Sequence, residues 1–170
     1  MTDDLLPPNE AERQAALDEC GILDTLPEQA YYEIVALAAS ICEAPIASMS
    51  LIDRDREWIK AIVGVEVKEV PREVSFCAHT ILTPEMMVVH DALDDDRFAN
   101  NQFVTNAPHI RFYAGVPLTI AGDCNVGSLC VVDVVPRELT ESQLNTLRTL
   151  ASQVSTQLEM RRQMRAQDAS

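Results

Sequence analysis

Residues Phe112 to Asp133 read FYAGVPLTIAGDCNVGSLCVVD. Two runs of apolar and β-branched residues, Tyr113 to Ile120 and Val126 to Val134, flank the turn formers Gly122 to Asn125. Gly and Asn adopt the left-handed backbone conformation that tight turns need. The stretch therefore predicts a β-hairpin. Pro117 lacks a backbone donor, so its strand is expected to lie at an edge or to carry a bulge.

A second hairpin is predicted upstream. Residues 46 to 52 alternate in character, which is typical of a strand with two different faces. One side is expected to hold Ala47, Met49 and Leu51, and the other Ser48 and Ser50. The charged segment Asp53 to Arg56 forms the turn, and Glu57 to Val63 alternates again around Trp58.

Capping signals predict two helices before the first strand. Asn9 offers an N-cap for a helix that stops near Cys20, where Gly21 can close it in the left-handed conformation. A second helix begins at the capping-box spacing of Thr25 and Glu28 and ends before Pro45. Its apolar face is expected to comprise Ala30, Ile34, Leu37, Ala38, Ile41 and Cys42.

The last helix is expected from about residue 141 to 166, because Thr140 and Gln143 have the spacing of a capping box. Apolar residues follow in alternating steps of three and four, a heptad-like seam of Leu144, Leu147, Ala151, Val154 and Leu158. Two interpretations of this seam stay open. It pairs two chains into a homodimer, or it packs onto the chain's own sheet.

Strands that arrive as hairpins and helices at both termini predict an α+β fold: an antiparallel sheet with the terminal helices packed on one face. The 170 residues suit one domain. We expect a flexible leader over residues 1–8, a single domain over 9–166 with its long C-terminal helix at 141–166, and a tail over 167–170.

The chain is acidic, with a formal net charge of -14. Nucleic acids and anionic membranes are bound by basic surfaces, so neither is an expected partner. No secretory signal is seen at the amino end and no apolar run approaches the roughly 20 residues that span a bilayer. The expected location is the cytoplasm, where the cysteines, Cys20, Cys42, Cys77, Cys124 and Cys130, are free thiols.

The connector between Gly64 and His109 carries few periodic signals. Phe76 to Leu82 is expected to form a short helix and Met86 to His90 a short strand, whereas Asp91 to Asn106 has no clear period. Long irregular segments on a rigid scaffold commonly form binding regions. Any site is therefore expected in this connector.

Several segments in the same order resemble GAF domains of bacterial sensor histidine kinases and diguanylate cyclases. They are SFCAHTIL at 75–82, HIRFYAGVPL at 109–118, GSLCVVD at 127–133 and PRELT at 136–140, with Glu12-Arg13 in the first helix. The resemblance implies a GAF-like, PAS-related fold with an antiparallel sheet of about six strands. It also implies a sensory module of signal transduction, such as a two-component system, that binds a small ligand between sheet and connector and responds through its terminal helices.

The resemblance leaves other roles open. A free-standing domain, a regulator acting on a separate kinase or cyclase, and a piece of a larger sensor are all compatible with it. Free methionine sulfoxide reductases are stand-alone GAF proteins that use connector cysteines, and Cys77 has a similar place, but the connector has no second thiol to resolve a sulfenic acid. We therefore expect no enzymatic activity, and a free-standing thiol-dependent enzyme that uses Cys77 stays the weaker alternative. A ligand-free interaction and dimerisation module, with a pocket filled by its own side chains, is a further alternative.

Residues with reactive groups gather in the connector. Cys77, His79, His90 and Asp91 could supply a nucleophile with its base or a zinc site. Cys77 and His79 are two residues apart, which separates them around a helix, so a structural role is favoured and no metal is expected. Bilin-binding GAF domains attach the chromophore through a cysteine that is directly followed by histidine, whereas here Ala78 separates Cys77 from His79. Covalent bilin attachment is therefore not expected. The Asn-Lys, Phe and Asp-Glu signature of cyclic-nucleotide-binding GAF domains is missing as well. The cofactor stays unknown.

A small-molecule pocket would need aromatic walls and a few polar groups. The candidates for its lining are Trp58, Phe76, Cys77, His79, His90, Arg97, Phe112 and Tyr113. Aromatic residues also dominate cores, so a core position is the favoured interpretation for Trp58, Phe76 and Phe112 taken one by one.

Overall fold

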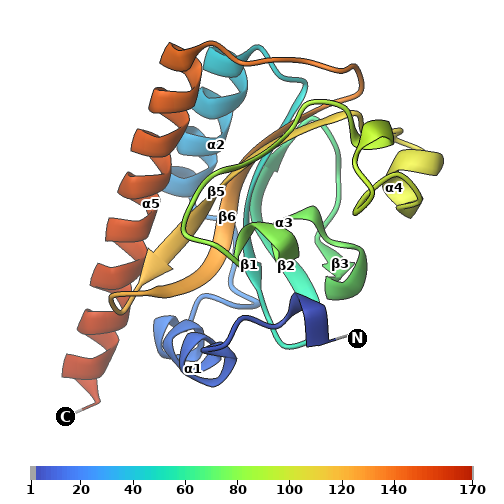
Figure 1. The fold of residues 1–170 in the computed structure, drawn as a ribbon. Coiled ribbons are helices and arrows are strands. Elements are labelled where there is room, and N and C mark those ends of the chain that lie inside the picture. Colours follow the sequence, from blue (N-terminus) through green and yellow to red (C-terminus); the bar gives the residue numbers. More distant parts are fainter. Residues whose placement is uncertain (1–2, 170) are drawn as a thin grey trace.

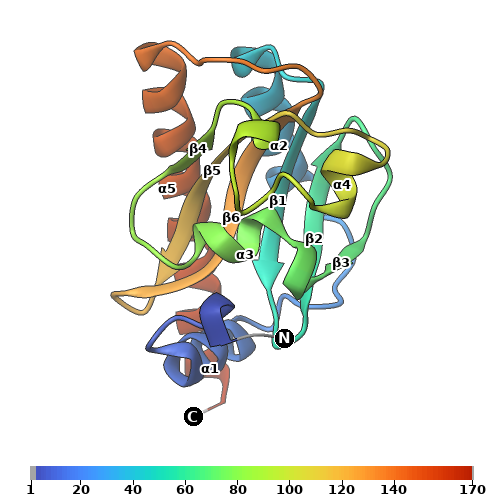
Figure 2. The same ribbon diagram turned by 45° about the vertical axis from the view of Figure 1, so that its right-hand side comes forward.

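The computed structural model describes residues 3–169. Within them a six-stranded antiparallel sheet has the order β3-β2-β1-β6-β5-β4. Helices α1 (Glu10–Cys20), α2 (Gln29–Cys42) and α5 (Glu141–Asp168) cover one face (Figure 1). The connector, which includes the short helices α3 (Phe76–Thr80) and α4 (Gln102–Thr105), covers the other (Figure 2). The predicted α+β fold is confirmed.

The predicted hairpin at residues 112–133 consists of β5 (Phe112–Ile120) and β6 (Cys124–Asp133), so the turn is shorter than expected. Strand β4 (Met87–Val89) pairs with β5 only as far as Gly115. Pro117 therefore lies on an edge that no strand covers, and the pairing with β6 shifts register one residue later, between Leu118 and Thr119. Pro117 thus lies at an open edge and next to a register irregularity, as expected.

Strands β1 (Ile46–Ile52) and β2 (Arg56–Val63) form the predicted upstream hairpin. The alternation in β1 is as expected, because Ala47, Met49 and Leu51 lie in the core under the helices. In β2, Ile59 pairs with Ser50 and Ala61 with Met49, which leaves Lys60 as the extra residue of a β-bulge. Before the bulge odd-numbered residues face away from the long helices, and after it even-numbered residues do so.

The core under the helices is continuous, and its buried members come from all three long helices and from strands β1, β2, β5 and β6. The predicted apolar face of α2 is correct for Ala38 and Cys42 and wrong for Ala30 and Leu37. Its buried residues are Tyr31, Val35, Ala38 and Cys42, while Ala30 and Leu37 are exposed. The capping box was also wrong, because the Thr25 hydroxyl bonds to the Ile22 carbonyl and to Lys60 instead of capping the helix.

Helix α5 begins at the predicted capping box, with both reciprocal bonds between Thr140 and Gln143 present. Its seam packs on the chain's own sheet: Leu147, Ala151, Val154 and Leu158 are buried there and Leu144 is partly buried. The seam therefore presents no free surface to a second chain. Dimerisation stays a prediction that needs the exposed side of α5.

The described residues near both ends of the chain form more structure than expected. Helix α1 has the predicted bounds and ends at Gly21 with φ 60°, but no side chain caps its start. Within the expected leader over residues 1–8, Leu5 is buried and its carbonyl accepts a hydrogen bond from Arg72. The expected tail over 167–170 is shortened, because α5 runs through Asp168. Residues 1–2 and 170 of these predicted ends lie outside the described residues.

The connector contains more short elements than predicted. Helix α3 and strand β4 match the predicted helix and strand but are shorter. Strand β3 (Glu69–Pro71) and helix α4 were not predicted. A second core joins this connector to the sheet and includes Phe76, Phe98 and Tyr113.

Candidate ligand pocket

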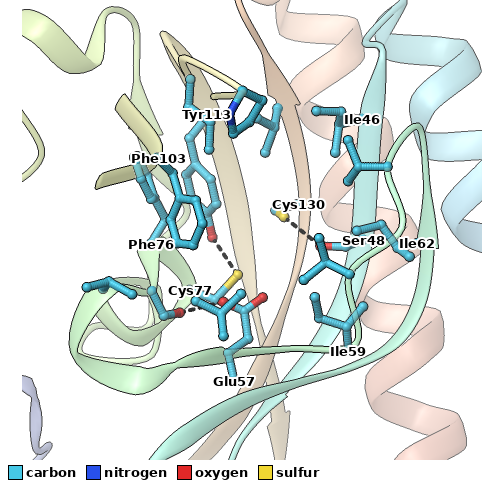
Figure 3. Close-up of a pocket in the computed structure, with 18 of the residues that line it drawn as sticks. Ile46, Ser48, Glu57, Ile59, Ile62, Phe76, Cys77, Phe103, Tyr113 and Cys130 are labelled. Atoms are coloured by element: carbon cyan, nitrogen blue, oxygen red, sulfur yellow. Dashed lines mark hydrogen bonds between the residues drawn. The ribbon is translucent and has the colours of Figure 1, made fainter. Parts of the chain in front are cut away.

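A cavity of about 360 Å³ lies between the sheet and the connector (Figure 3). Its floor consists of side chains from β1, β2, β5 and β6 on the face away from the long helices, and α3 closes one side. Most of the lining is aliphatic or aromatic: Ile46, Ile59, Ile62, Val65, Val67, Val70, Val74, Phe76, Phe103, Ala107, Pro108, Ile110, Tyr113 and Val132. The exposed residues Val67 and Ala107 place the mouth between the loop after β2 and the loop after α4.

Glu57 is the one charged residue of the described lining. It lies on β2 between the turn and the bulge, with its carboxylate beside Cys77 (Figure 3). Ser75 donates a hydrogen bond of 2.6 Å to Oε1 and Ser50 one of 2.7 Å to Oε2. Ser75 also caps α3 by accepting from the amide of Ala78, so the carboxylate is tied to the start of that helix.

Two thiols line the cavity near this carboxylate. Cys77 accepts a hydrogen bond from the Tyr113 hydroxyl at 3.2 Å, and Cys130 lies 3.1 Å from the Ser48 hydroxyl oxygen. The pKa of the Cys77 thiol lies well above its ordinary value, because of its hydrogen bond to Cys130, its burial and the nearby Glu57 carboxylate. A thiol that stays protonated is a poor nucleophile, so this environment does not activate Cys77.

An aromatic stack supports the pocket wall. The rings of Phe76 and Phe98 are stacked with centroids 4.1 Å apart, and Tyr113 lies 5.3 Å from Phe76. His79 packs edge-on against the outer side of Phe98 at 4.8 Å. Burial lowers the pKa of His79, so its ring is held as a neutral packing group.

The structure brings Phe76, Cys77 and Tyr113 of the predicted lining to the cavity. The prediction was wrong for Trp58 and Phe112, because both lie in the core under the helices and not at the cavity. Successive residues of a strand point to opposite faces, and these two have the opposite parity to Glu57 and Tyr113. The aromatic character of Trp58 and Phe112 outweighed this parity in the sequence interpretation.

The other three predicted residues lie outside the cavity. His79 is behind Phe98, and Arg97 pairs with Asp95 at 2.7 Å while stacking over the Phe98 ring. His90 is exposed, with Nδ1 3.0 Å from the Arg137 carbonyl oxygen. These contacts are structural and explain the three side chains without a ligand.

Sequence reasoning missed the polar groups of the lining, which are Ser48, Glu57, Ser75 and Cys130. A signal existed for two of them. Ser48 was expected on the side of β1 away from the apolar residues. Glu57 directly precedes Trp58 in β2, so the two side chains point to opposite faces of the sheet. Ser75 and Cys130 carried no comparable signal, since the contacts that bring them to the cavity join distant parts of the chain.

A buried charge network connects the pocket loop with α1. Arg72, three residues before Ser75, donates to Glu10 at 2.9 Å and to the Leu5 carbonyl at 3.2 Å. Arg13 of α1 donates to the same Glu10 carboxylate at 2.6 Å and to the Ile52 carbonyl at 2.7 Å. Both guanidinium groups are almost fully buried. The network fixes the position of η2 (Arg72–Val74), the turn that precedes α3, relative to the amino-terminal helix.

Among residues 3–169, no group of three or more His, Cys, Asp or Glu side chains is arranged to hold a metal ion. Within the same residues, no helix combines the length and apolar character needed to cross a membrane.

An antiparallel six-stranded sheet with helices on one face and a hollow connector on the other defines the class of GAF- and PAS-like domains. The chain belongs to the GAF domain family, whose model matches residues 26–158.

Three known proteins illustrate the similarity. A cyclic di-GMP phosphodiesterase of Pseudomonas aeruginosa is 44% identical over 131 residues, which are 77% of this chain and 22% of that protein. The GAF domain of a phosphoenolpyruvate-protein phosphotransferase from Coxiella burnetii has a TM-score of 0.66 at 16% identity, covering 95% of this chain and 99% of that one. Free methionine-R-sulfoxide reductase from Neisseria meningitidis has a TM-score of 0.61 at 18% identity, covering 99% and 95%.

The first of these relatives corrects one expectation. The sequence interpretation was that the protein is not an enzyme, whereas the relative at 44% identity is named as a phosphodiesterase. Because this chain spans only 22% of that enzyme, the similarity concerns its GAF part. The two solved structures, at less than 20% identity, support the fold alone.

Proposed function

We propose that this chain is a signal-input domain in which a small molecule enters the cavity between sheet and connector and alters the terminal helices. The observation that carries the proposal is the cavity of about 360 Å³, within the size range of small-molecule sites, with apolar walls and a cluster of polar groups on one side. An interaction module without a ligand predicts a pocket filled by side chains, and this cavity argues against that alternative.

The route to the terminal helices runs through the buried charge network. Ser75 and Phe76 line the cavity and follow directly after η2, whose Arg72 is bonded to Glu10. A ligand that displaces α3 would therefore also move Arg72 and, through its bond to Glu10, the start of α1. The end of α1 contacts α5, because Arg161 donates to the Cys20 carbonyl and Arg165 to the Glu19 carbonyl.

The output is proposed from the phosphodiesterase relative. A GAF region 44% identical to part of a cyclic di-GMP phosphodiesterase suits the regulation of cyclic di-GMP turnover, by an output unit in the same polypeptide or by a partner protein. The resemblance to sensor kinases and diguanylate cyclases keeps those as further candidate outputs. The proposed location is the cytoplasm, where the five free thiols stay reduced.

A homodimer is part of the proposal, with an interface on the exposed side of α5. Met160 and Met164 are one helical turn apart there and are 57% and 61% exposed. Light scattering is the test, with Met164→Glu as the variant. A dimer mass that falls to that of a monomer supports this interface, and a monomer mass for the wild type removes it.

The neutral fluorescent probe N-phenyl-1-naphthylamine tests the pocket. We expect saturable binding with one site in the wild type and loss of binding in Ile62→Trp, which fills the cavity from β2. Hydrogen exchange should slow in α3 and at the start of α1 when the probe is bound. Equal binding by the variant would place the probe elsewhere, and unchanged exchange in α1 would remove the proposed route.

A further inference from the structure

Glu57 is a buried carboxylate without a counter-ion in the described part of the chain. The residue is 7% exposed, and its partners there are the hydroxyl groups of Ser75 and Ser50, one on each oxygen. An ionised carboxylate offers about four acceptor positions, so two remain free. A buried charge is normally paired with an opposite charge, because removal from water is costly. At Glu57 this pairing is missing on the side of the cavity.

The rest of the lining contains no positive group among the described residues. Its other polar members are two hydroxyl-bearing serines, Ser48 and Ser75, the Tyr113 hydroxyl and two thiols. A phosphate or a carboxylate on a ligand would therefore meet Glu57 without a cation to offset the repulsion. The net charge of -14 acts in the same direction, since it attracts cations to the surface and repels anions.

We infer that the ligand of this pocket is a mainly apolar amine, whose protonated nitrogen pairs with the free side of the Glu57 carboxylate. This inference rests on the proposed function, because it assigns a chemical class to the molecule that occupies the cavity. The ammonium group supplies the missing counter-ion and donates to the two free acceptor positions. The hydrocarbon body fills the space between the β-sheet and the loop after β2, which contributes Val65 and Val67 to the lining.

The inference also explains why the carboxylate is held so firmly. Ser75 and Ser50 approach from α3 and β1, so both oxygens are oriented before a ligand arrives. A preoriented charge loses little freedom on binding, which favours affinity. Because Ser75 caps α3, an ammonium group that draws on Glu57 acts directly on the element that leads to η2 and α1.

Three compounds of the same shape test the charge preference: 4-phenylbutylamine, 4-phenylbutanol and 4-phenylbutyrate. Each competes with bound N-phenyl-1-naphthylamine in the wild type, in Glu57→Gln and in Glu66→Gln. Glu66 is the matched control, because it is exposed between two residues of the pocket rim, Val65 and Val67. Retained probe binding by each variant reports that its pocket is folded.

In the wild type we expect the amine to displace the probe at a concentration roughly ten to a hundred times lower than the carboxylate does, with the alcohol between them. Glu57→Gln should remove the advantage of the amine over the alcohol, while Glu66→Gln should keep it. Equal displacement by the amine and the alcohol in the wild type would overturn the inference, as would an amine preference that survives in Glu57→Gln. Absence of probe binding to the wild type would instead defeat the proposed function itself.

Discussion

The two faces of the sheet come from the same strands but differ in how they are filled. Under the long helices, side chains such as Met49, Leu51 and Leu129 form a closed core. On the opposite face the neighbouring positions carry Ser48, Ser50 and Cys130, and part of the space is a cavity. One face is a closed apolar core, and the other combines polar groups with a cavity. Because successive residues of a strand point to opposite faces, the same strands supply both surfaces.

The strongest test of this comparison pairs one truncation on each face. Leu147→Ala removes a fully buried side chain of α5 from the closed core, and we expect a loss of about 2–5 kcal/mol in the free energy of unfolding. Ile59→Ala, in the cavity wall, should cost less than half of that, because the wall already lacks partner atoms on one side. Urea denaturation measures both. Equal losses would mean that the two faces are packed alike.

Glu10→Gln tests the network that joins the two faces. The variant keeps the shape of the side chain but loses the charge shared by Arg13 and Arg72, and hydrogen bonds to charged groups contribute about 1.5–3 kcal/mol each. We expect a loss of roughly 2 kcal/mol in the free energy of unfolding at pH 7. The control is Glu85→Gln, an exposed carboxylate in the connector, which should change stability by less than about 0.5 kcal/mol.

The same pair of variants has a pH signature. Burial acts to raise the pKa of Glu10, but the hydrogen bonds from Arg72 and Arg13 outweigh it and lower the pKa below its ordinary value. A carboxyl with a lowered pKa stabilises the fold above its unfolded pKa, about 4.3, and loses this effect as the pH falls through the folded pKa. The stability difference between wild type and Glu10→Gln should therefore be complete at neutral pH and shrink below about pH 4. A difference that stays constant down to pH 3 contradicts the charged network.

Tyr113→Phe tests the polar side of the hollow face. The Tyr113 hydroxyl lies 2.8 Å from Thr80 Oγ1, 3.1 Å from Ser128 Oγ and 3.2 Å from Cys77 Sγ. Its removal leaves buried groups without a partner, so we expect a loss of about 1–2 kcal/mol in thermal or urea unfolding. Tyr32→Phe, on the exposed side of α2, serves as the control and should have little effect. An unchanged stability in Tyr113→Phe would mean that the hydroxyl cluster adds nothing to the fold.

The smallest expected effect concerns the start of α5, on the closed face. Thr140→Ala removes the side-chain half of the capping box, and such a loss costs about 1 kcal/mol. Thr149→Ala, within the same helix, should be neutral or slightly stabilising, because alanine is the better helix former. Opposite signs in the two variants, measured by thermal unfolding, identify the cap as the cause.

The regular parts of the fold were predictable because periodicity and caps are local. Both hairpins, the bounds of α1 and the capping box of α5 follow from residues close together in the sequence. The face of α2 was predicted only in part, because the apolar residues Ala30 and Leu37 lie on its exposed side and mislead a periodicity argument.

The pocket was predictable in place but only partly in composition. A long connector over a sheet indicated where it lies, and Phe76, Cys77 and Tyr113 were correct as lining residues. Glu57 was missed because the search favoured aromatic and reactive groups over the strand parity that separates it from Trp58. The hydrogen bonds from Ser75 and Ser50 to Glu57 depend on tertiary contacts, so no local sequence pattern predicts them.

The bulge at Lys60 divides β2 into two halves of opposite phase. Before it, odd-numbered residues such as Ile59 face the cavity, and after it the even-numbered Ile62 does so. Lys60 itself is held on the helix side by Glu28 at 2.6 Å. Loss of Lys60 would close the bulge and put β2 into a single phase, while Ile59 and Ala61 keep their partners Ser50 and Met49 and both faces keep their side chains. The register of β2 therefore tolerates the loss of one residue at this position, although the bonds of Lys60 to Glu28, Thr25 and Leu26 would be lost.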